Sequence, residues 1–224
     1  KTLCIEELSN DKGKPNFGGT CLNVGCIPSK SLLDSSHRYY EAKKNLSDHG
    51  IQLGDVKLDL KTMMERKDNI VSKLTGGIDG LFLTNKVESI CGKGKVISKN
   101  TVQIDKADGS SEKVDAKNII IATGSSPIEI PAASFGKHIV DSTGALAFDS
   151  VPKRLGVVGA GIIGLELGSV WSRLGSEVTV IEALEDFLPM TDIDISKESL
   201  KEFKKQGLDI QLASKVTSTK ELKN

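Results

Sequence analysis

The sequence shows no excess of charge of either sign and has few aromatic residues. Its 224 residues carry 30 basic and 30 acidic side chains, and 4% are Phe, Trp or Tyr. This balance argues against a nucleic-acid binder held by bulk positive charge, an acidic disordered tail and a low-complexity chain. No run approaches the roughly 18 apolar residues of a membrane helix, and the N-terminus has no signal-peptide core. The sequence therefore predicts a globular protein of one or two domains, with no nucleic-acid or membrane partner.

Cysteine is also scarce. Four cysteines, at positions 4, 21, 26 and 91, are too few for a secreted disulfide scaffold. Cys4 and Cys91 fall in β-like runs, so we expect them to be small core residues. Cys21 and Cys26 stand close together and need a separate explanation.

Short β-branched runs alternate with segments of helical apolar spacing, which predicts an α/β fold with βαβ units around a parallel sheet. The predicted strands are Thr2–Ile5, Asn118–Ala122, Leu155–Val158 and Glu177–Ile181. The predicted helices run from about Thr20 to Lys44, Leu60 to Leu83, Gly161 to Leu174 and Ile195 to Gln206. Alternation over 87–105 and 113–115, with a turn at 106–109, predicts a small antiparallel excursion. A domain boundary is expected near 141–152.

The second half carries a dinucleotide-binding pattern. The strand Leu155–Val158 leads into a GxGxxG turn, a helix and a second strand that ends at Glu182. A glycine turn before a helix N-terminus suits a pyrophosphate, and an acid about 20 residues further on suits the ribose hydroxyls. A carboxylate there repels a 2′-phosphate, which favours NAD over NADP. The turn residues that we expect to contact the dinucleotide are Gly159, Gly161, Ile162 and Gly164; the alternative is a glycine-rich turn with no ligand.

Glu166 lies on the apolar side of the predicted helix, between Ile162 and Val170. A carboxylate in that position needs a cationic partner or a polar cavity, unless it reaches solvent from the helix edge.

The segment Gly18–Lys30 contains the cysteine pair. In a continuous helix, residues five apart have Cα atoms about 8.6 Å from each other, beyond the reach of a disulfide. Gly25 and Pro28 could distort the backbone enough for a bond, and an accessible pair at a helix start suits a catalytic dithiol. The alternatives are a zinc half-site, disfavoured because the three histidines are scattered, and two unrelated buried thiols.

Glu6 ends its predicted strand as Glu182 ends its own. By that symmetry Glu6 is the ribose acid of a first Rossmann unit, whose glycine turn would lie about 20 residues upstream. We therefore expect the natural protein to begin before Lys1. The alternative is a solvated acid at a strand end.

Three motifs together resemble the flavin disulfide oxidoreductase family over essentially the whole chain. They are GGTCLNVGCIPSK at 18–30, IATG at 121–124 and GAGIIGLE at 159–166. Leu22 and the ending IPSK at 27–30 are most similar to the members that oxidise protein-bound dihydrolipoyl groups. The resemblance implies two Rossmann-like, three-layer domains, both incomplete here: an FAD-binding domain over 1–145 and an NAD-binding domain over 146–224.

The resemblance also implies roles for single residues. Cys21 is expected to exchange with the dithiol substrate, Cys26 to interact with the flavin, and Lys30 to pair with Glu166 near the flavin. Further positions match those that the family uses around FAD, namely Glu6, Gly19, Thr20, Gly94, Thr123, Gly124 and Ser125. Val216, at the end of a strand-like run, matches a position near the NAD adenine.

The implied reaction passes electrons from a dihydrolipoyl group through the Cys21–Cys26 disulfide and FAD to NAD⁺. The implied partners are lipoyl domains of 2-oxoacid dehydrogenase or glycine cleavage complexes and a second copy in a homodimer. A histidine backed by a glutamate, from a C-terminal domain of the partner subunit, is expected beyond Asn224 as general base. The segment after the cysteine motif is more similar to bacterial members of the family. We therefore expect the protein to lie in the bacterial cytoplasm, or in the mitochondrial matrix if it is eukaryotic.

Other readings stay open. Ser29 counts against glutathione reductase, and Glu182 counts against both glutathione and mercuric reductases, which usually take NADP. A non-catalytic scaffold with the same fold is a further alternative. Cys21 and Cys26 argue against it, because a binding module has no need of a strained dithiol.

Overall fold

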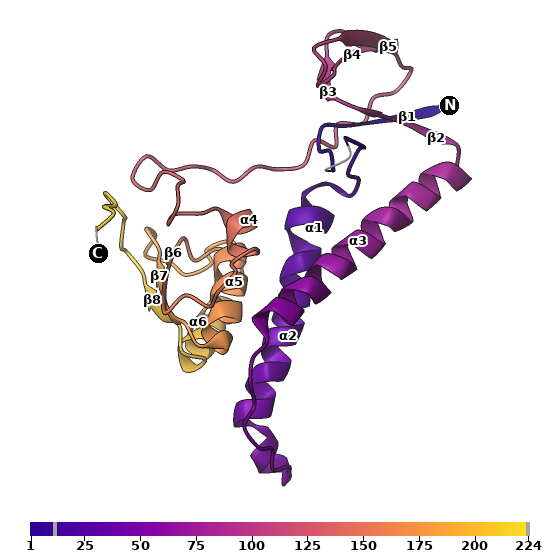
Figure 1. Ribbon diagram of the computed structural model, residues 1–224. Coiled ribbons are helices and arrows are strands. Elements are labelled where there is room, and N and C mark those ends of the chain that lie inside the picture. The colour runs from indigo at the N-terminus through magenta and orange to yellow at the C-terminus, as the bar shows by residue number, and fades with distance from the viewer. Residues whose placement is uncertain (11–12, 223–224) are drawn as a thin grey trace. The chain divides into compact units, whose positions relative to one another are not determined.

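The computed structural model describes residues 1–10 and 13–222 (Figure 1), and it divides into two compact units. The first unit comprises 1–26 and 69–126, and the second comprises 27–68 and 127–224. Within the described part of the chain, no helix combines the length and apolar character that crossing a membrane requires.

The first unit contains a parallel pair of strands and an antiparallel sheet. Strand β1 (Thr2–Glu6) pairs in parallel with β2 (Val87–Cys91), with Thr2 opposite Val87. The antiparallel sheet has the order β3-β4-β5, built from β3 (Lys93–Val96), β4 (Thr101–Asp105) and β5 (Ser111–Asp115). The turn between β4 and β5 closes through a hydrogen bond from Gly109 N–H to the Lys106 carbonyl at 3.0 Å. The predicted antiparallel excursion and its turn are thus confirmed from Lys93 onward, but its first part is wrong, because 87–91 pairs in parallel with β1.

The second unit contains a βαβ sheet of the predicted kind. Strands β6 (Arg154–Val158), β7 (Glu177–Ile181) and β8 (Asp209–Gln211) are all parallel and lie in the order β6-β7-β8. Helix α5 (Ile162–Leu174) connects β6 to β7, and α6 (Ile193–Lys205) connects β7 to β8. Gly175, in the left-handed conformation, ends α5, and the Asp192 side chain caps the start of α6.

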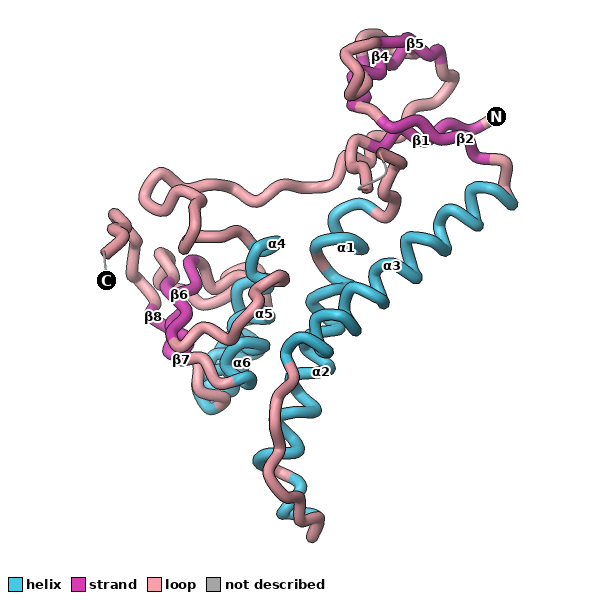
Figure 2. The backbone as a smooth tube through the Cα atoms, viewed as in Figure 1, coloured by secondary structure: helices cyan, strands magenta, loops and turns pink. Residues whose placement is uncertain are grey.

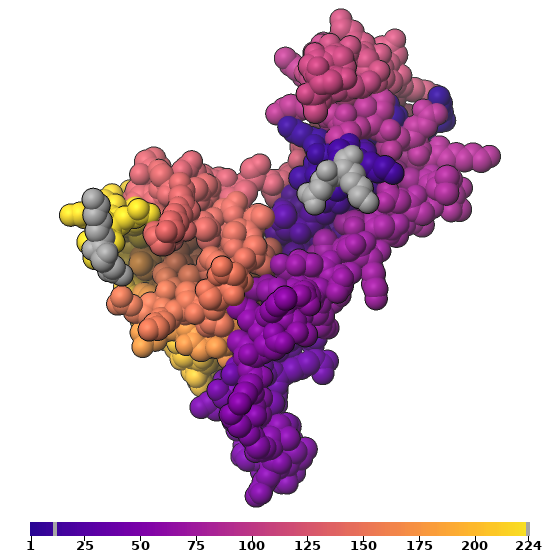
Figure 3. All heavy atoms as spheres, viewed as in Figure 1, coloured from indigo at the N-terminus to yellow at the C-terminus, as the bar shows by residue number. Residues whose placement is uncertain are grey.

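Helix α5 has two apolar faces, and each face packs into a separate core cluster. One core cluster lies between α5 and the sheet and contains Ala160, Leu165, Val178, Val180, Phe187, Leu208 and Ile210. The other surrounds the fully buried Trp171 and contains Leu32, Leu146, Leu167, Val170 and Leu174. In the space-filling view, the segment 142–211 carries the orange to yellow colours (Figure 3).

The remaining helices are α1 (Gly19–Val24), α2 (Cys26–Lys44), a 3-10 turn (Leu46–His49), α3 (Leu60–Thr84) and α4 (Ser142–Ala145). The single helix predicted for 20–44 is therefore wrong in one respect, since it is interrupted at Gly25. The short α4, capped by the Asp141 side chain, was not predicted.

The strand predicted at Asn118–Ala122 is also wrong. This segment pairs with no strand among the described residues and is drawn as loop in Figure 2. Ile120 and Ile121 are 89% and 76% exposed. A β-branched apolar run forms a strand only where a neighbouring strand satisfies its backbone N–H and C=O groups.

Candidate active site

The two motif cysteines form a disulfide across the break between α1 and α2. The Cα atoms of Cys21 and Cys26 are 4.7 Å apart, well below the 8.6 Å or so of a continuous helix. Gly25 makes the close approach possible, with φ −132° and ψ −112°. A Cβ at Gly25 would stand 3.0 Å from the Thr20 carbonyl oxygen and 3.2 Å from the Cys21 Cα. The predicted distortion at Gly25 is confirmed, while Pro28 lies inside the first turn of α2, where proline is tolerated.

Glu166 of α5 has the cationic partner that the sequence required. Its Oε1 lies 2.5 Å from Lys30 Nζ, and its Oε2 accepts a hydrogen bond from Ser29 Oγ at 3.2 Å. The Glu166 side chain is 25% exposed and that of Lys30 is 60% exposed. The predicted Lys30–Glu166 pair is thus confirmed, with the lysine more open to solvent than the carboxylate.

A third group joins the start of α1 to the loop after β5. The Ser125 N–H donates to Thr20 Oγ1 at 3.1 Å, and that hydroxyl donates to the Ser125 carbonyl at 3.3 Å. A Cβ at Gly124 would lie 2.9 Å from Thr20 Oγ1. Thr20 therefore meets two further predicted FAD positions, Gly124 and Ser125, that follow it by more than 100 residues; Thr123, next to them, is exposed.

The other predicted FAD positions lie along β1, α1 and β3. Glu6 ends β1, and its Oε1 accepts the Leu8 N–H at 2.9 Å. Gly94 in β3 faces the Ile5 side chain, because a Cβ there would be 3.5 Å from Ile5 Cγ2. Gly19 is the first residue of α1.

The glycine turn after β6 has the geometry of a dinucleotide cradle. Gly159 has φ +101°, which a residue with a Cβ rarely adopts. A Cβ at Gly164 would lie 2.4 Å from the Gly159 carbonyl oxygen and 3.0 Å from Val157 Cγ1, so only glycine lets α5 approach β6 this closely. Around Gly161, by contrast, a Cβ would meet no atom within 4 Å.

Glu182 lies directly after β7 and reaches this turn. Its Oε2 accepts the Ala160 N–H at 2.8 Å, and its Oε1 accepts the Leu184 N–H at 2.9 Å. Gly161 is the N-cap of α5 and makes no side-chain capping bond, and Ile162, the first helical residue, is 67% exposed. Open N–H groups beside a carboxylate fit a pyrophosphate joined to a ribose.

Val216 does not close a strand, which corrects the sequence prediction. Strand β8 ends at Gln211, and the chain continues beside the end of β7 through hydrogen bonds of Ala213 N–H to the Leu184 carbonyl and of Ser214 N–H to the Glu182 carbonyl. The left-handed backbone of Ala213, φ +51°, ends the extended course before Val216 is reached.

Cys4 and Cys91 are half-buried in β1 and β2 and belong to neither core cluster, so their assignment as core residues is wrong. A parallel pair of strands leaves their side chains partly covered. Burial, and to a smaller extent the Glu6 carboxylate, raises the pKa of the Cys4 thiol.

Two site residues were missed by sequence reasoning. One is Ser29, whose hydrogen bond to Glu166 was not predicted, and the other is Asn23. The Asn23 amide donates to the carbonyls of Phe17 and Gly19 at 3.2 and 3.0 Å and so holds the glycine loop before Cys21. Position in the cysteine motif was the only available signal for both.

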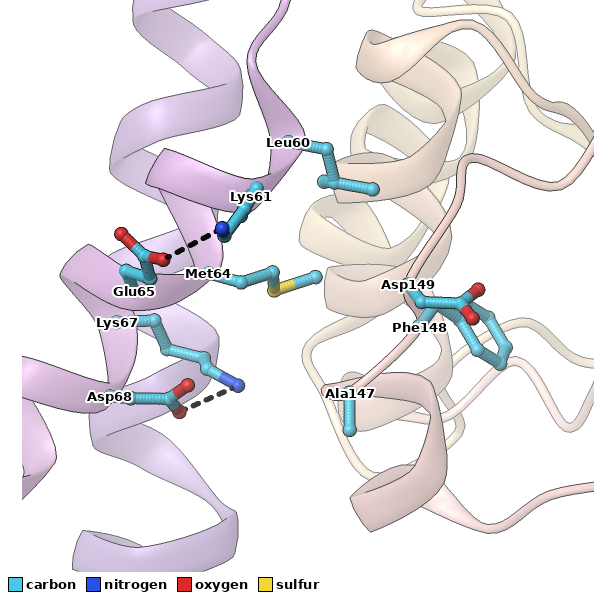
Figure 4. Close-up of a pocket in the computed structure, with 9 residues that line it drawn as sticks. All are labelled: Leu60, Lys61, Met64, Glu65, Lys67, Asp68, Ala147, Phe148 and Asp149. Carbon is cyan, nitrogen blue, oxygen red and sulfur yellow. Dashed lines mark ion pairs between the residues drawn. The ribbon is translucent and has the colours of Figure 1, made fainter.

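A separate hollow of about 430 Å³ in the second unit contains none of the predicted site residues (Figure 4). It lies between the start of α3 and the loop Ala147–Asp149. The buried Lys67 at its wall donates to the Leu146 carbonyl at 2.9 Å and pairs with Asp68 at 3.0 Å. Lys67 thus joins α3 to the end of α4, which is a structural role.

The chain is similar to known proteins along its length. The family pattern described as pyridine nucleotide-disulphide oxidoreductase matches residues 1–224. The chain is 52% identical over 217 residues to a leghemoglobin reductase of Vigna unguiculata, covering 96% of this chain and 40% of that protein. It is 50% identical to a dihydrolipoyl dehydrogenase of Cupriavidus necator, covering 95% of this chain and 45% of that protein. The chain therefore spans less than half the length of these curated relatives.

Solved structures show the same fold. LpdA of Mycobacterium tuberculosis matches with a TM-score of 0.81 and 25% identity, over 97% of this chain and 46% of that one. A Cu(II) complex of the HOCl-induced flavoprotein disulfide reductase RclA of Escherichia coli matches with a TM-score of 0.78 and 28% identity, over 99% and 45%. With its disulfide, its α/β fold and a family match along its whole length, this chain belongs to the pyridine nucleotide-disulphide oxidoreductase family.

Proposed function

We propose that the whole protein is a dihydrolipoyl dehydrogenase. The observation that carries the proposal is the Cys21–Cys26 disulfide at the start of α2, in a chain about half identical to dihydrolipoyl dehydrogenases from plants and bacteria. The substrate is then a protein-bound dihydrolipoyl group, and the partners are the lipoyl domains of 2-oxoacid dehydrogenase or glycine cleavage complexes. A homodimer in the bacterial cytoplasm, or in the mitochondrial matrix, fits the same proposal.

The disulfide takes two electrons from the substrate by thiol exchange. A substrate thiolate attacks Cys21 Sγ, a mixed disulfide forms, and Cys26 leaves as a thiolate. The second substrate thiol then attacks the substrate sulfur of the mixed disulfide. This closes the lipoyl disulfide and releases Cys21 as a thiolate. Two protons leave the substrate, so a general base is needed near neutral pH.

FAD and NAD fit the residues that are present. Glu6, Gly19, Thr20, Gly94, Thr123, Gly124 and Ser125 would hold FAD, and the glycine turn with Glu182 and Val216 would hold NAD. When bound, FAD supplies the two-electron relay between a dithiol and a nicotinamide. The chain's own part is to keep Cys26 and the Lys30 charge in fixed places on α2 and to offer the open N-terminus of α5 to a pyrophosphate.

The domain assignment belongs to this proposal. Residues 1–145 form the FAD-binding part, and residues 146–224 begin the NAD-binding part. The glycine turn of the second part lies between β6 and α5, and Glu6 at the end of β1 is the corresponding acid of the first.

The test uses the full-length protein and follows its flavin absorbance. We expect bleaching on addition of dihydrolipoamide and recovery on addition of NAD⁺. Cys26→Ser abolishes the bleaching, whereas Cys91→Ser, which removes a free thiol from β2, leaves it unchanged. Reduction by NADPH with turnover of glutathione disulfide or Hg²⁺ would point to another reductase of the family. A colourless protein that binds lipoyl domains would point to a scaffold.

A further inference from the structure

The Glu166 carboxylate is held at both oxygens by consecutive residues of α2. Lys30 Nζ contacts Oε1 at 2.5 Å and Ser29 Oγ contacts Oε2 at 3.2 Å. Because an ionised carboxylate only accepts, the Ser29 hydroxyl donates this hydrogen bond. The carboxylate is thereby fixed at two points.

The two contacts differ in their surroundings. Ser29 is 7% exposed, whereas the Lys30 side chain is 60% exposed. An ion pair that water reaches is weak and leaves both side chains free to reorient. A hydrogen bond from a buried hydroxyl to a charged acceptor is stronger, because little water competes with it. Ser29 therefore restrains the carboxylate on the side where Lys30 cannot.

The hydrogen bond between Ser29 and Glu166 also determines where the Lys30 ammonium group lies. With Oε2 held by Ser29, Oε1 has one orientation, and the Lys30 Nζ that it attracts has one position. Without Ser29 the carboxylate can turn about its last bond and carry the lysine charge with it. We propose that Ser29 is a positioning residue that acts through Glu166 to place the Lys30 charge for electron transfer; this rests on the proposed function.

Ser31 provides a matched control on the same helix. It is also a serine of α2 and is 6% exposed, but its Oγ accepts from Arg66 Nη1 at 3.0 Å. Ser31→Ala therefore removes a buried hydroxyl of equal size without touching the Glu166 carboxylate.

The experiment compares Ser29→Ala, Ser29→Thr and Ser31→Ala in the full-length, flavin-loaded protein. For Ser29→Ala we expect kcat with dihydrolipoamide to fall about tenfold, with KM within about twofold, as for a lost hydrogen bond to a charged group. The flavin absorbance maximum shifts with it. Ser29→Thr, which keeps the hydroxyl, restores both readouts, and Ser31→Ala changes neither.

A second background tests the route of the effect. In a Glu166→Leu protein, Ser29→Ala should cause no further change in kcat or in the flavin spectrum. An equal effect of Ser29→Ala with and without Glu166, or the same spectral shift in Ser31→Ala, overturns the proposal. If the unmutated protein does not oxidise dihydrolipoamide, the proposed function fails. The flavin spectra of the Ser29 and Ser31 variants then still decide the role of Ser29.

Discussion

The carboxylate of Glu182 accepts the backbone N–H of Ala160 at 2.8 Å and so ties the end of β7 to the glycine turn that follows β6. The parallel register of the strands, with Val158 opposite Ile181, brings the next residues of both strands to the same edge. Glu182 also accepts the N–H of the residue two positions later, Leu184, and Glu6 does the same with Leu8. The two acids thus share a local geometry.

The first prediction concerns Glu182→Ala in the full-length protein. We expect the NADH dissociation constant to rise about tenfold or more, because hydrogen bonds to a charged acceptor are lost. NADPH binding should fall less, since the repulsion of a 2′-phosphate is lost at the same time. Fluorescence titrations with both dinucleotides measure the ratio. Glu177→Ala, at the exposed start of the same strand, is the control, and an equal loss for both dinucleotides would contradict the assignment.

The second prediction separates two glycines of one turn. Gly164→Ala places a Cβ against the Gly159 carbonyl and Val157, and we expect it to destabilise the fold by about 1–3 kcal/mol. Gly161→Ala meets open space, so thermal unfolding should stay unchanged while NADH binding weakens. Calorimetry and NADH titration of both variants check this. Equal unfolding temperatures for the two variants would argue against the close approach of α5 to β6.

The third prediction concerns Lys30→Met. Because the lysine side chain is 60% exposed, the free energy of unfolding should change by no more than about 1 kcal/mol. Flavin reduction by dihydrolipoamide should nevertheless slow about a hundredfold, as when one preorganised charge is removed from an active site. Stopped-flow absorbance measures the rate. Lys61→Met breaks the exposed pair with Glu65 and should leave the rate unchanged; a rate in Lys30→Met close to the unmutated one would refute the role.

The fourth prediction concerns Trp171. Its side chain is fully buried, its Nε1 donates to the Ala145 carbonyl at 3.1 Å, and its ring lies 5.1 Å from that of Phe148. Trp171→Ala should lower the free energy of unfolding by about 3–5 kcal/mol, and Trp171→Phe by less. Urea unfolding followed by circular dichroism measures both losses. A loss as large in the Phe variant would mean that the hydrogen bond, not the volume, dominates.

The fifth prediction concerns the Cys4 thiol. Burial, with a smaller contribution from Glu6, raises its pKa. Less thiolate is then present at pH 8 than in an unfolded peptide, so alkylation should be slower and should accelerate as the pH rises. Iodoacetamide labelling read by mass spectrometry measures the rate against a peptide of the same local sequence. Labelling at the peptide's rate would contradict the burial of this thiol.

Much of the site could be predicted because its signals are local. The strand, glycine turn and helix from 155 to 174 follow one another in sequence, and the requirements for glycine at 159 and 164 arise within the same few residues. The break at Gly25 could be anticipated for the same reason, since an unbroken helix cannot bring Cys21 and Cys26 within bonding distance.

Errors arose where a distant partner decides the structure. Asn118–Ala122 has the composition of a strand but no neighbouring strand, and the extended course after β8 ends before Val216. The meeting of Thr20 with Ser125 joins residues 105 positions apart, and no local pattern encodes such a contact.

The amino-acid sequence by itself determined the βαβ order, the glycine turn with its acid, and the need of Glu166 for a cation, because these follow from steric and electrostatic rules within one or two elements. Only the tertiary structure decided that Ser29 shares the Glu166 carboxylate with Lys30, that β2 pairs in parallel with β1, and that α5 is buried on two faces. The physical reason is that hydrogen bonds and burial between distant segments depend on which surfaces meet, and that is settled by packing of the whole chain.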